Sequence, residues 1–307
     1  MSAVLSRRPA VPAGLAGLAG LAGPTGPAEW TGPVGPGVPR VGFVNLMPHA
    51  EQFESMLMPQ FAAAPPFQPV WIKVASRRYA LDDRDSIHRR YQLLGAALQD
   101  APLDAMVITG AAVEHLPFSE VRFLDEVARA VDYAARRDLP VLGLCWGALA
   151  VGHLVLGLAH QVFQTKVSGA FPTDLLVRDH PIGDGLDDRF WTAHSRFAGF
   201  DEATVAQAVR AGRMRVVARS AAAGTVIAES ADHSILMHIG HPEYAGARLA
   251  EEYRRDLRLG LSNVHAPANI DLDHPVSQWR SHSLVFFANW IRLVHERASA
   301  PRQVRSS

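Results

Sequence analysis

The stretch Leu139–Leu156, LPVLGLCWGALAVGHLVL, constrains the fold more than any other part of this chain. Its first half, Pro140 to Leu144, is apolar and too short for a helix, so it predicts a buried strand. The residues from Trp146 onward are apolar and rich in alanine, which favours a buried helix. The only cysteine in the sequence, Cys145, therefore falls on a tight turn between a strand and a helix.

Two glycines flank this cysteine in Gly143-Leu144-Cys145-Trp146-Gly147, the cysteine version of the G-x-S-x-G nucleophile elbow. The turn would hold the sulfur above the sheet edge at a helix N-terminus, where free N–H groups and the helix dipole favour a negative charge. The thiolate is the nucleophilic form of cysteine. The N–H of Trp146 would face an oxyanion on an acyl group bound there. The alternative is a small core residue, since free cysteines are often buried.

Composition excludes several classes of function. Lys plus Arg and Asp plus Glu each number 30, so the formal net charge is zero, and no basic stripe predicts binding to nucleic acid or to a membrane surface. No apolar run reaches the roughly 18 residues of a membrane span. A single cysteine excludes an internal disulfide framework and favours a reducing compartment, so we expect a cytoplasmic protein.

The chain divides into three parts by composition. Residues 1–39 are rich in Ala, Gly and Pro with almost no charge, which predicts a disordered leader. Residues 40–297 have the length and pattern of a single α/β domain. Residues 298–307 are expected to form a disordered tail.

Strands and helices alternate in the first half of the domain. We expect buried strands at 41–45, 70–75, 105–109 and 140–144, and helices at 51–61, 86–98, 121–137 and 146–156. This order predicts a mostly parallel sheet with helices on both faces and with Asn45, Gly110 and Cys145 at neighbouring strand ends. Short strands at 163–170, 214–220, 225–229 and 234–239 predict an antiparallel extension, followed by helices at 247–259 and 281–296.

A nucleophilic cysteine needs a base, and the base needs an orienting group. His241-Pro242-Glu243 supplies both at the end of a predicted strand, because residues i and i+2 point to the same side of an extended chain. The alternative is a surface histidine, since the chain has 14. The sequence contains no H-E-x-x-H or paired-cysteine pattern, so it does not predict a metal site.

Together these residues resemble the class I glutamine-amidotransferase fold, which is flavodoxin-like. More closely, residues 40 to about 296 resemble the homoserine O-acyltransferases of methionine biosynthesis. The matching segments are Val44-Asn45-Leu46-Met47-Pro48, Val107-Ile108-Thr109-Gly110-Ala111, Cys145-Trp146, Lys166-Val167-Ser168-Gly169, Ala193-His194-Ser195-Arg196-Phe197, Gly240-His241-Pro242-Glu243-Tyr244 and Trp279-Arg280-Ser281-His282, in the same order and spacing.

The resemblance implies a ping-pong transfer from acyl-CoA, as co-substrate, to L-homoserine, with no other cofactor and no metal. It implies a cytoplasmic homodimer. The roles it implies are a Cys145 nucleophile, a His241 base held by Glu243, an oxyanion hole at the N–H groups of Trp146 and Ala111, and substrate contacts from Lys166, Ser195 and Arg255. Glu114 stands where acetyl-transferring members have Glu and many succinyl-transferring ones have Gly, so acetyl-CoA is the expected donor.

The chain also departs from the family pattern. The segment 49–54 replaces a Lys-containing segment and a Thr-Glu run, Leu149 replaces a Gln after the nucleophile, and Ala112 replaces a Pro. Serine or a related hydroxy amino acid is therefore the alternative acceptor. The other readings are a glutamine amidotransferase or γ-glutamyl hydrolase using the same three residues, and a binding module that has lost its activity.

Overall fold

The computed structural model describes residues 35, 37–80 and 84–299. Nearly all of the predicted leader and most of the predicted tail lie outside the described residues. The last helix continues to Ser299, so residues 298 and 299 are helical and do not belong to the tail.

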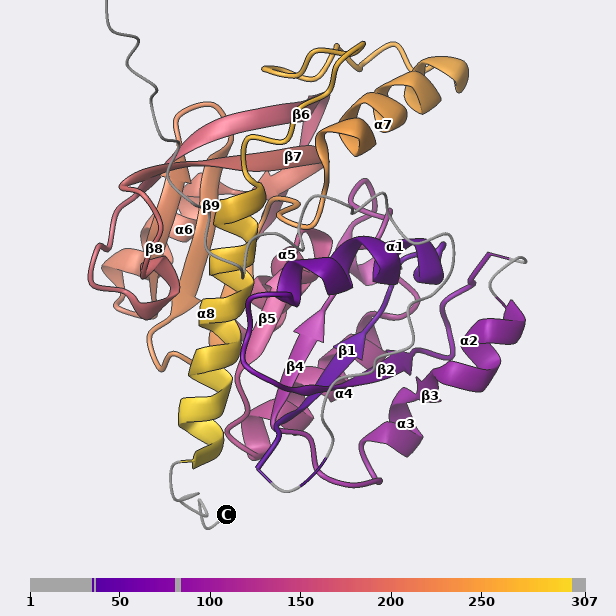
Figure 1. Ribbon diagram of the computed structural model, residues 1–307, viewed down its shortest axis with the longest axis vertical. Coiled ribbons are helices and arrows are strands. Elements are labelled where there is room, and N and C mark those ends of the chain that lie inside the picture. Colours follow the sequence, from indigo (N-terminus) through magenta and orange to yellow (C-terminus); the bar gives the residue numbers. More distant parts are fainter. Residues whose placement is uncertain (1–34, 36, 81–83, 300–307) are drawn as a thin grey trace, which may run out of the picture.

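A ten-stranded sheet with the order β3-β2-β1-β4-β5-β10-β9-β8-β6-β7 forms the centre of the described chain (Figure 1). Neighbouring strands run parallel from β3 to β10, and antiparallel from β10 to β7. The strands are β1 Arg40–Val44, β2 Gln68–Lys73, β3 Gln92–Leu93, β4 Ala105–Ile108, β5 Val141–Leu144, β6 His160–Leu175, β7 Arg189–Phe200, β8 Met214–Ser220, β9 Gly224–Ser230 and β10 Ile235–His238. This confirms the predicted α/β class with its parallel core and antiparallel extension.

Helices cover both faces of the sheet (Figure 1). The helices are α1 Ala50–Leu57, α2 Arg84–Arg90, α3 Leu94–Ala97, α4 Leu124–Arg136, α5 Trp146–Leu156, α6 Glu202–Arg210, α7 Gly246–Arg258 and α8 Arg280–Ser299. Apolar side chains of α3, α4 and α5 form the core on one face, and those of α1 and α8 form it on the other. Phe286, Phe287 and Trp290 of α8 are all buried in the second core.

One predicted helix is wrong. The sequence pattern predicts a single helix over residues 86–98, but the chain leaves α2 at Tyr91, pairs Gln92 with Ile72 of β2, and then forms α3. Tyr91 is buried, and its hydroxyl accepts a hydrogen bond from Asn45 Nδ2 at 3.0 Å. This tertiary contact outweighs the helical periodicity of the segment.

The antiparallel half contains two elements that the sequence pattern did not predict, β7 and α6. Strand β7 shows no regular alternation of buried and exposed residues, and polar side chains such as those of His194 and Arg196 are buried within it. Strand β6 is also longer than expected, because it pairs along most of its length with β7. Helix α6 begins after Asp201, whose carboxylate accepts the N–H of Thr204 at 2.9 Å.

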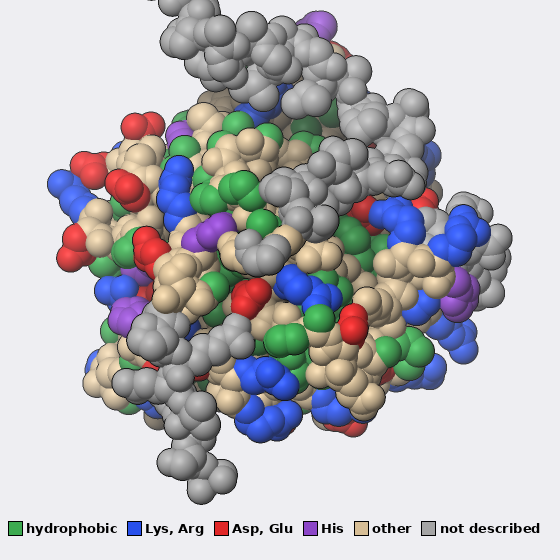
Figure 2. All heavy atoms as spheres, turned by 60° about the horizontal axis from the view of Figure 1, so that its bottom comes forward, with side chains coloured by type: hydrophobic (Ala, Val, Ile, Leu, Met, Phe, Trp, Pro, Cys, Tyr) green, Lys and Arg blue, Asp and Glu red, His purple; other side chains and the backbone are tan. Residues whose placement is uncertain are grey.

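The surface agrees with the balanced charge of the sequence. On the face shown in Figure 2, basic and acidic side chains are scattered among each other. Within the described residues, no helix is both long and apolar enough to span a membrane.

Candidate active site

Cys145 lies at the turn between β5 and α5, with φ 49° and ψ −114°. A residue other than glycine in this region costs on the order of 1–3 kcal/mol and persists only where its surroundings hold it. Here the Cys145 N–H donates to the His238 carbonyl at 2.8 Å, and its carbonyl accepts from the Ala148 N–H at 3.1 Å. The predicted nucleophile elbow is therefore present in the backbone as well as in the sequence pattern.

The two glycines of the elbow leave no room for side chains. A Cβ on Gly143 would lie 2.6 Å from the Cα of Ala148, and a Cβ on Gly147 would lie 2.2 Å from the carbonyl oxygen of Ile108. The elbow thus packs against the end of β4, and this brings the loop that follows β4 next to Cys145. A Cβ on Gly110 would lie 3.5 Å from that of Cys145.

His241 and Glu243 form the expected pair, with 2.7 Å between Nδ1 and Oε1. The expected backbone was wrong, however: residues 241–244 form a turn closed by the Tyr244 N–H and the His241 carbonyl at 3.1 Å, not an extended segment. Two bonds from the C-terminal part of the chain hold this turn. Ser283 Oγ donates to the Pro242 carbonyl at 2.6 Å, and Trp279 Nε1 donates to the Tyr244 carbonyl at 2.7 Å.

His241 and Cys145 meet because β5 and β10 are adjacent parallel strands, which end next to each other. Burial alone would lower the pKa of His241, but the charges of Cys145 and Glu243 and hydrogen bonds to both raise it well above its usual value. These interactions therefore favour the protonated imidazole beside the sulfur. Glu243 is 2% exposed, and it reaches the site only through His241.

The three residues expected to contact substrate also lie together. Lys166 Nζ lies 2.6 Å from Asp256 Oδ2, Arg255 Nη2 lies 2.7 Å from Asp256 Oδ1, and Ser195 Oγ donates to Glu252 Oε2. Sequence reasoning missed the two acids, because Glu252 and Asp256 resemble ordinary charged residues of an amphipathic helix. Both are buried, and the spacing of buried positions along α7 is the one signal that could have indicated them.

The carboxylate of Glu252 interacts with several side chains of this cluster. Burial alone would raise its pKa, but Lys166, Arg248 and the hydroxyl of Ser195 lower it, so Glu252 stays ionised. Its other oxygen accepts from the Tyr244 hydroxyl at 3.1 Å and lies 3.2 Å from Arg248 Nη2. The ionised Glu252 carboxylate thus lies beside the basic side chains of Lys166, Arg248 and Arg255.

A cavity of about 460 Å³ joins the two groups of residues. Its walls include the predicted residues Cys145, His241, Lys166, Ser195, Arg255, Glu114 and Ala111, together with His49, Gln52 and Phe53 from the segment that departs from the family pattern. Trp146 is buried in the core and its side chain does not line the cavity. In the described part of the chain, His, Cys, Asp and Glu side chains form no group of three that could hold a metal ion.

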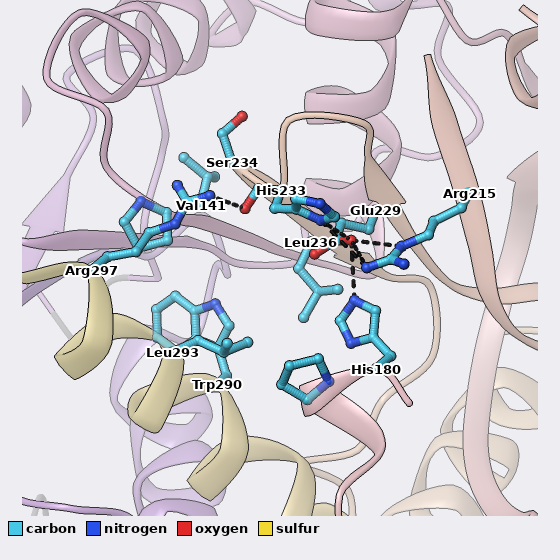
Figure 3. A pocket seen from close by; sticks show the side chains of 12 residues that line it. Val141, His180, Arg215, Glu229, His233, Ser234, Leu236, Trp290, Leu293 and Arg297 are labelled. Carbon is cyan, nitrogen blue, oxygen red and sulfur yellow. Dashed lines mark hydrogen bonds and ion pairs between the residues drawn. The ribbon is translucent and has the colours of Figure 1, made fainter. Parts of the chain in front are cut away.

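A second cavity, of about 280 Å³, lies where β5 and β10 begin (Figure 3). None of the predicted site residues lines it. Glu229 stands at its edge, with Oε2 at 3.1 Å from His180 Nε2, 2.9 Å from Arg215 and 2.7 Å from His233 Nδ1. Burial alone would raise the pKa of Glu229, but hydrogen bonds and charges from these three partners lower it to about 2.

Glu229→Gln is therefore expected to destabilise the fold in a pH-dependent way. A carboxyl whose pKa is lowered from 4.5 to about 2 stabilises the folded state above about pH 5, and this contribution disappears as the pH falls toward 2. Urea unfolding should give a difference of about 3 kcal/mol at pH 7 between the parent protein and the variant, closing at low pH. The exposed Glu296→Gln on α8 is the control. A difference in unfolding free energy that does not change with pH would contradict the ion pairs assigned to Glu229.

Comparison with known proteins gives consistent matches. A family model described as homoserine O-succinyltransferase matches residues 38–300. A homoserine O-succinyltransferase from Shewanella amazonensis is 31% identical over 261 residues, covering 82% of this chain and 80% of that protein. A homoserine O-acetyltransferase from Bifidobacterium adolescentis is 30% identical over 260 residues, covering 82% and 74%.

Solved structures match at the level of the fold alone. A glutamine amidotransferase from Thermotoga maritima aligns with a TM-score of 0.54 at 13% identity, covering 85% of this chain and 99% of that one. The expected glutamine-amidotransferase-like architecture is thereby confirmed.

Proposed function

Because the chain belongs to the homoserine O-succinyltransferase family, we propose that it transfers an acetyl group from acetyl-CoA to the hydroxyl of L-homoserine through a thioester on Cys145. The family makes the chain a homoserine O-acyltransferase, and its named relatives include both succinyl- and acetyl-transferring enzymes. The observation that supports the covalent route is the meeting of Cys145 and His241 at the ends of adjacent strands, in the wall of the cavity.

In the first half-reaction the Cys145 thiolate attacks the acyl carbonyl of the donor. The developing oxyanion lies near the N–H groups of Trp146 and Ala111, which belong to the helix start and to the loop that the elbow touches. When the tetrahedral intermediate collapses, the C–S bond to CoA breaks, and the leaving thiolate takes the proton of the His241 imidazolium. The products are free CoA and a thioester on Cys145, with a neutral imidazole beside it.

In the second half-reaction His241 acts as the base. The thioester carries no charge, so the interaction with Cys145 that raises the pKa of His241 is lost on acylation. The neutral imidazole can then take the proton of the acceptor hydroxyl while the oxygen attacks the thioester. The C–S bond to Cys145 breaks, and the thiolate and the imidazolium are restored.

The amino acid that accepts the acyl group is bound by the cluster that Lys166 forms with side chains of α7. Homoserine carries a carboxylate and an ammonium group, and the cluster offers Lys166 and Arg255 for the first and Glu252 for the second. Asp256 bridges the two cations, which fixes the distance between them before the substrate enters. Such a prearranged site binds with a smaller cost in side-chain ordering.

The donor is selected by Glu114, which is half-buried in the cavity wall. Its carboxylate would repel the distal carboxylate of a succinyl group and would also shorten the pocket. Glu114→Gly is expected to raise kcat/KM for succinyl-CoA relative to acetyl-CoA by about tenfold or more, which corresponds to roughly 1.4 kcal/mol. Glu120→Gly, at an exposed position beyond the cavity lining, is the control. An unchanged donor ratio would refute the role of Glu114.

The proposed function is tested by following the release of free CoA. The purified protein is mixed with acetyl-CoA or succinyl-CoA and with homoserine, serine or no acceptor. Turnover that needs both acetyl-CoA and homoserine is the expected result. Faster turnover with succinyl-CoA would overturn acetyl-CoA as the proposed donor. Turnover with serine but not with homoserine would overturn homoserine as the proposed acceptor. No release of CoA with any pair would overturn the reaction itself.

A further inference from the structure

Tyr244 lies against the proposed catalytic histidine, and its ring, its hydroxyl and its backbone carbonyl each make a contact. Its ring stacks on the His241 imidazole with 4.2 Å between the ring centroids and 19° between the planes. The side chain is 4% exposed. Its hydroxyl donates to Glu252 Oε1 at 3.1 Å, and its carbonyl accepts from Trp279 Nε1 at 2.7 Å.

We propose that Tyr244 is a positioning residue that sets the plane of the His241 imidazole toward Cys145. Glu243, the orienting acid, holds the ring through Nδ1. A bond at that nitrogen fixes the tautomer, but it leaves the ring free to turn about the axis of the bond. A nearly parallel ring at van der Waals distance removes this freedom, because any rotation of the imidazole would collide with it. This inference deepens the proposed function and rests on it.

The hydroxyl of Tyr244 adds a hydrogen bond to a ring that is already confined by burial. Glu252, its acceptor, is itself held by Lys166 at 3.6 Å, by Arg248 at 3.2 Å and by Ser195 Oγ. The tyrosine is therefore anchored to a buried ion cluster at one end and to its own backbone turn at the other. Its ring cannot follow the imidazole if the imidazole rotates, which is what a positioning contact requires.

The effect can be read from the single cysteine without any substrate. Alkylation by iodoacetamide follows the thiolate fraction of Cys145, and that fraction depends on the imidazolium beside it. The charged or titratable groups that face His241 are Cys145 and Glu243, with Glu252 behind Tyr244, and His194 and His238 on β7 and β10. Burial lowers the pKa of His238 to about 3 and that of His194 well below its usual value. Neither of the two histidines therefore titrates near neutral pH.

The experiment compares alkylation rates between pH 5 and pH 9 in the parent protein and three variants. Tyr244→Leu removes the ring and should slow alkylation at pH 6 about tenfold. Tyr244→Phe keeps the ring and should restore a profile close to that of the parent. Tyr253→Leu, on the same helix α7 as Glu252 but outside the cavity lining, should leave the profile unchanged.

Steady-state kinetics complete the test. We expect Tyr244→Leu to lower kcat about tenfold at unchanged donor KM, and Tyr244→Phe to stay within about threefold of the parent. A Tyr244→Leu profile that coincides with that of the parent, or a Tyr244→Phe profile shifted as far as that of Tyr244→Leu, would overturn the proposal. If the parent protein releases no CoA, the proposed function fails, while the alkylation profiles still decide the role of Tyr244.

Discussion

Cys145→Ala is expected to lower the release of CoA by at least about four orders of magnitude while the melting temperature stays within a few degrees of that of the parent. The variant has no atom that can form the thioester, so neither half-reaction can occur on the enzyme. The fold should survive, because Cys145 is only partly buried and its backbone contacts do not involve the sulfur. Activity is measured as free CoA, and stability by thermal unfolding.

Mass spectrometry of the intact protein supplies the decisive control. After incubation with acetyl-CoA alone, the parent protein should gain the mass of one acetyl group, and Cys145→Ala should gain none. His241→Gln is the companion variant, because it keeps the sulfur and loses the base. Release of CoA by Cys145→Ala within tenfold of the parent rate would rule out a covalent intermediate on this residue.

Gly147→Ala is expected to destabilise the fold by about 3 kcal/mol or more and to lower the melting temperature by roughly 6–12 °C. The added Cβ would lie 2.2 Å from the carbonyl oxygen of Ile108 and 2.6 Å from that of Thr109. Both atoms belong to the backbone at the end of β4, so they cannot move aside as a flexible side chain would. Any shift also displaces Gly110 and Ala111, so kcat should fall together with stability.

Gly95→Ala is the matched control for this substitution. Gly95 lies in helix α3, and a Cβ built on it meets no atom within 4 Å. Alanine at an exposed helical position without steric conflict stabilises a protein by roughly 0.5–1 kcal/mol. Equal melting temperatures for Gly147→Ala and Gly95→Ala would show that the elbow accepts a side chain at position 147, against the short distances given above.

The proposed catalytic residues could be brought together from the sequence because their signals are local. The glycines around Cys145 indicate a tight turn without reference to the rest of the chain, and His241 and Glu243 stand two residues apart. The acids of the acceptor cluster have no such signal. Glu252 and Asp256 are buried and pair with Lys166, which lies on a strand far away in the sequence.

The missed elements have the same cause. Strand β7 contains buried polar residues whose partners lie elsewhere in the chain, such as Arg196, which donates to the Ala223 carbonyl at 2.5 Å. Periodicity treats such a segment as irregular, because the polar side chains interrupt the apolar pattern. The break at Tyr91 likewise depends on Asn45, which lies on the loop after β1. Patterns within one segment cannot report a partner that folding brings from another.

The position of β10 between β5 and β9 has a consequence for how the protein is made. Cys145 emerges from the ribosome long before His241, and all of β6 to β9 is synthesised between them. Closing so long a loop is entropically costly and slow, and pairing of β10 with β5 is the step that completes it. Until then Cys145 lacks both the neighbouring His241 and the His238 carbonyl that anchors its backbone. The contact between these two side chains is thus a late event of folding.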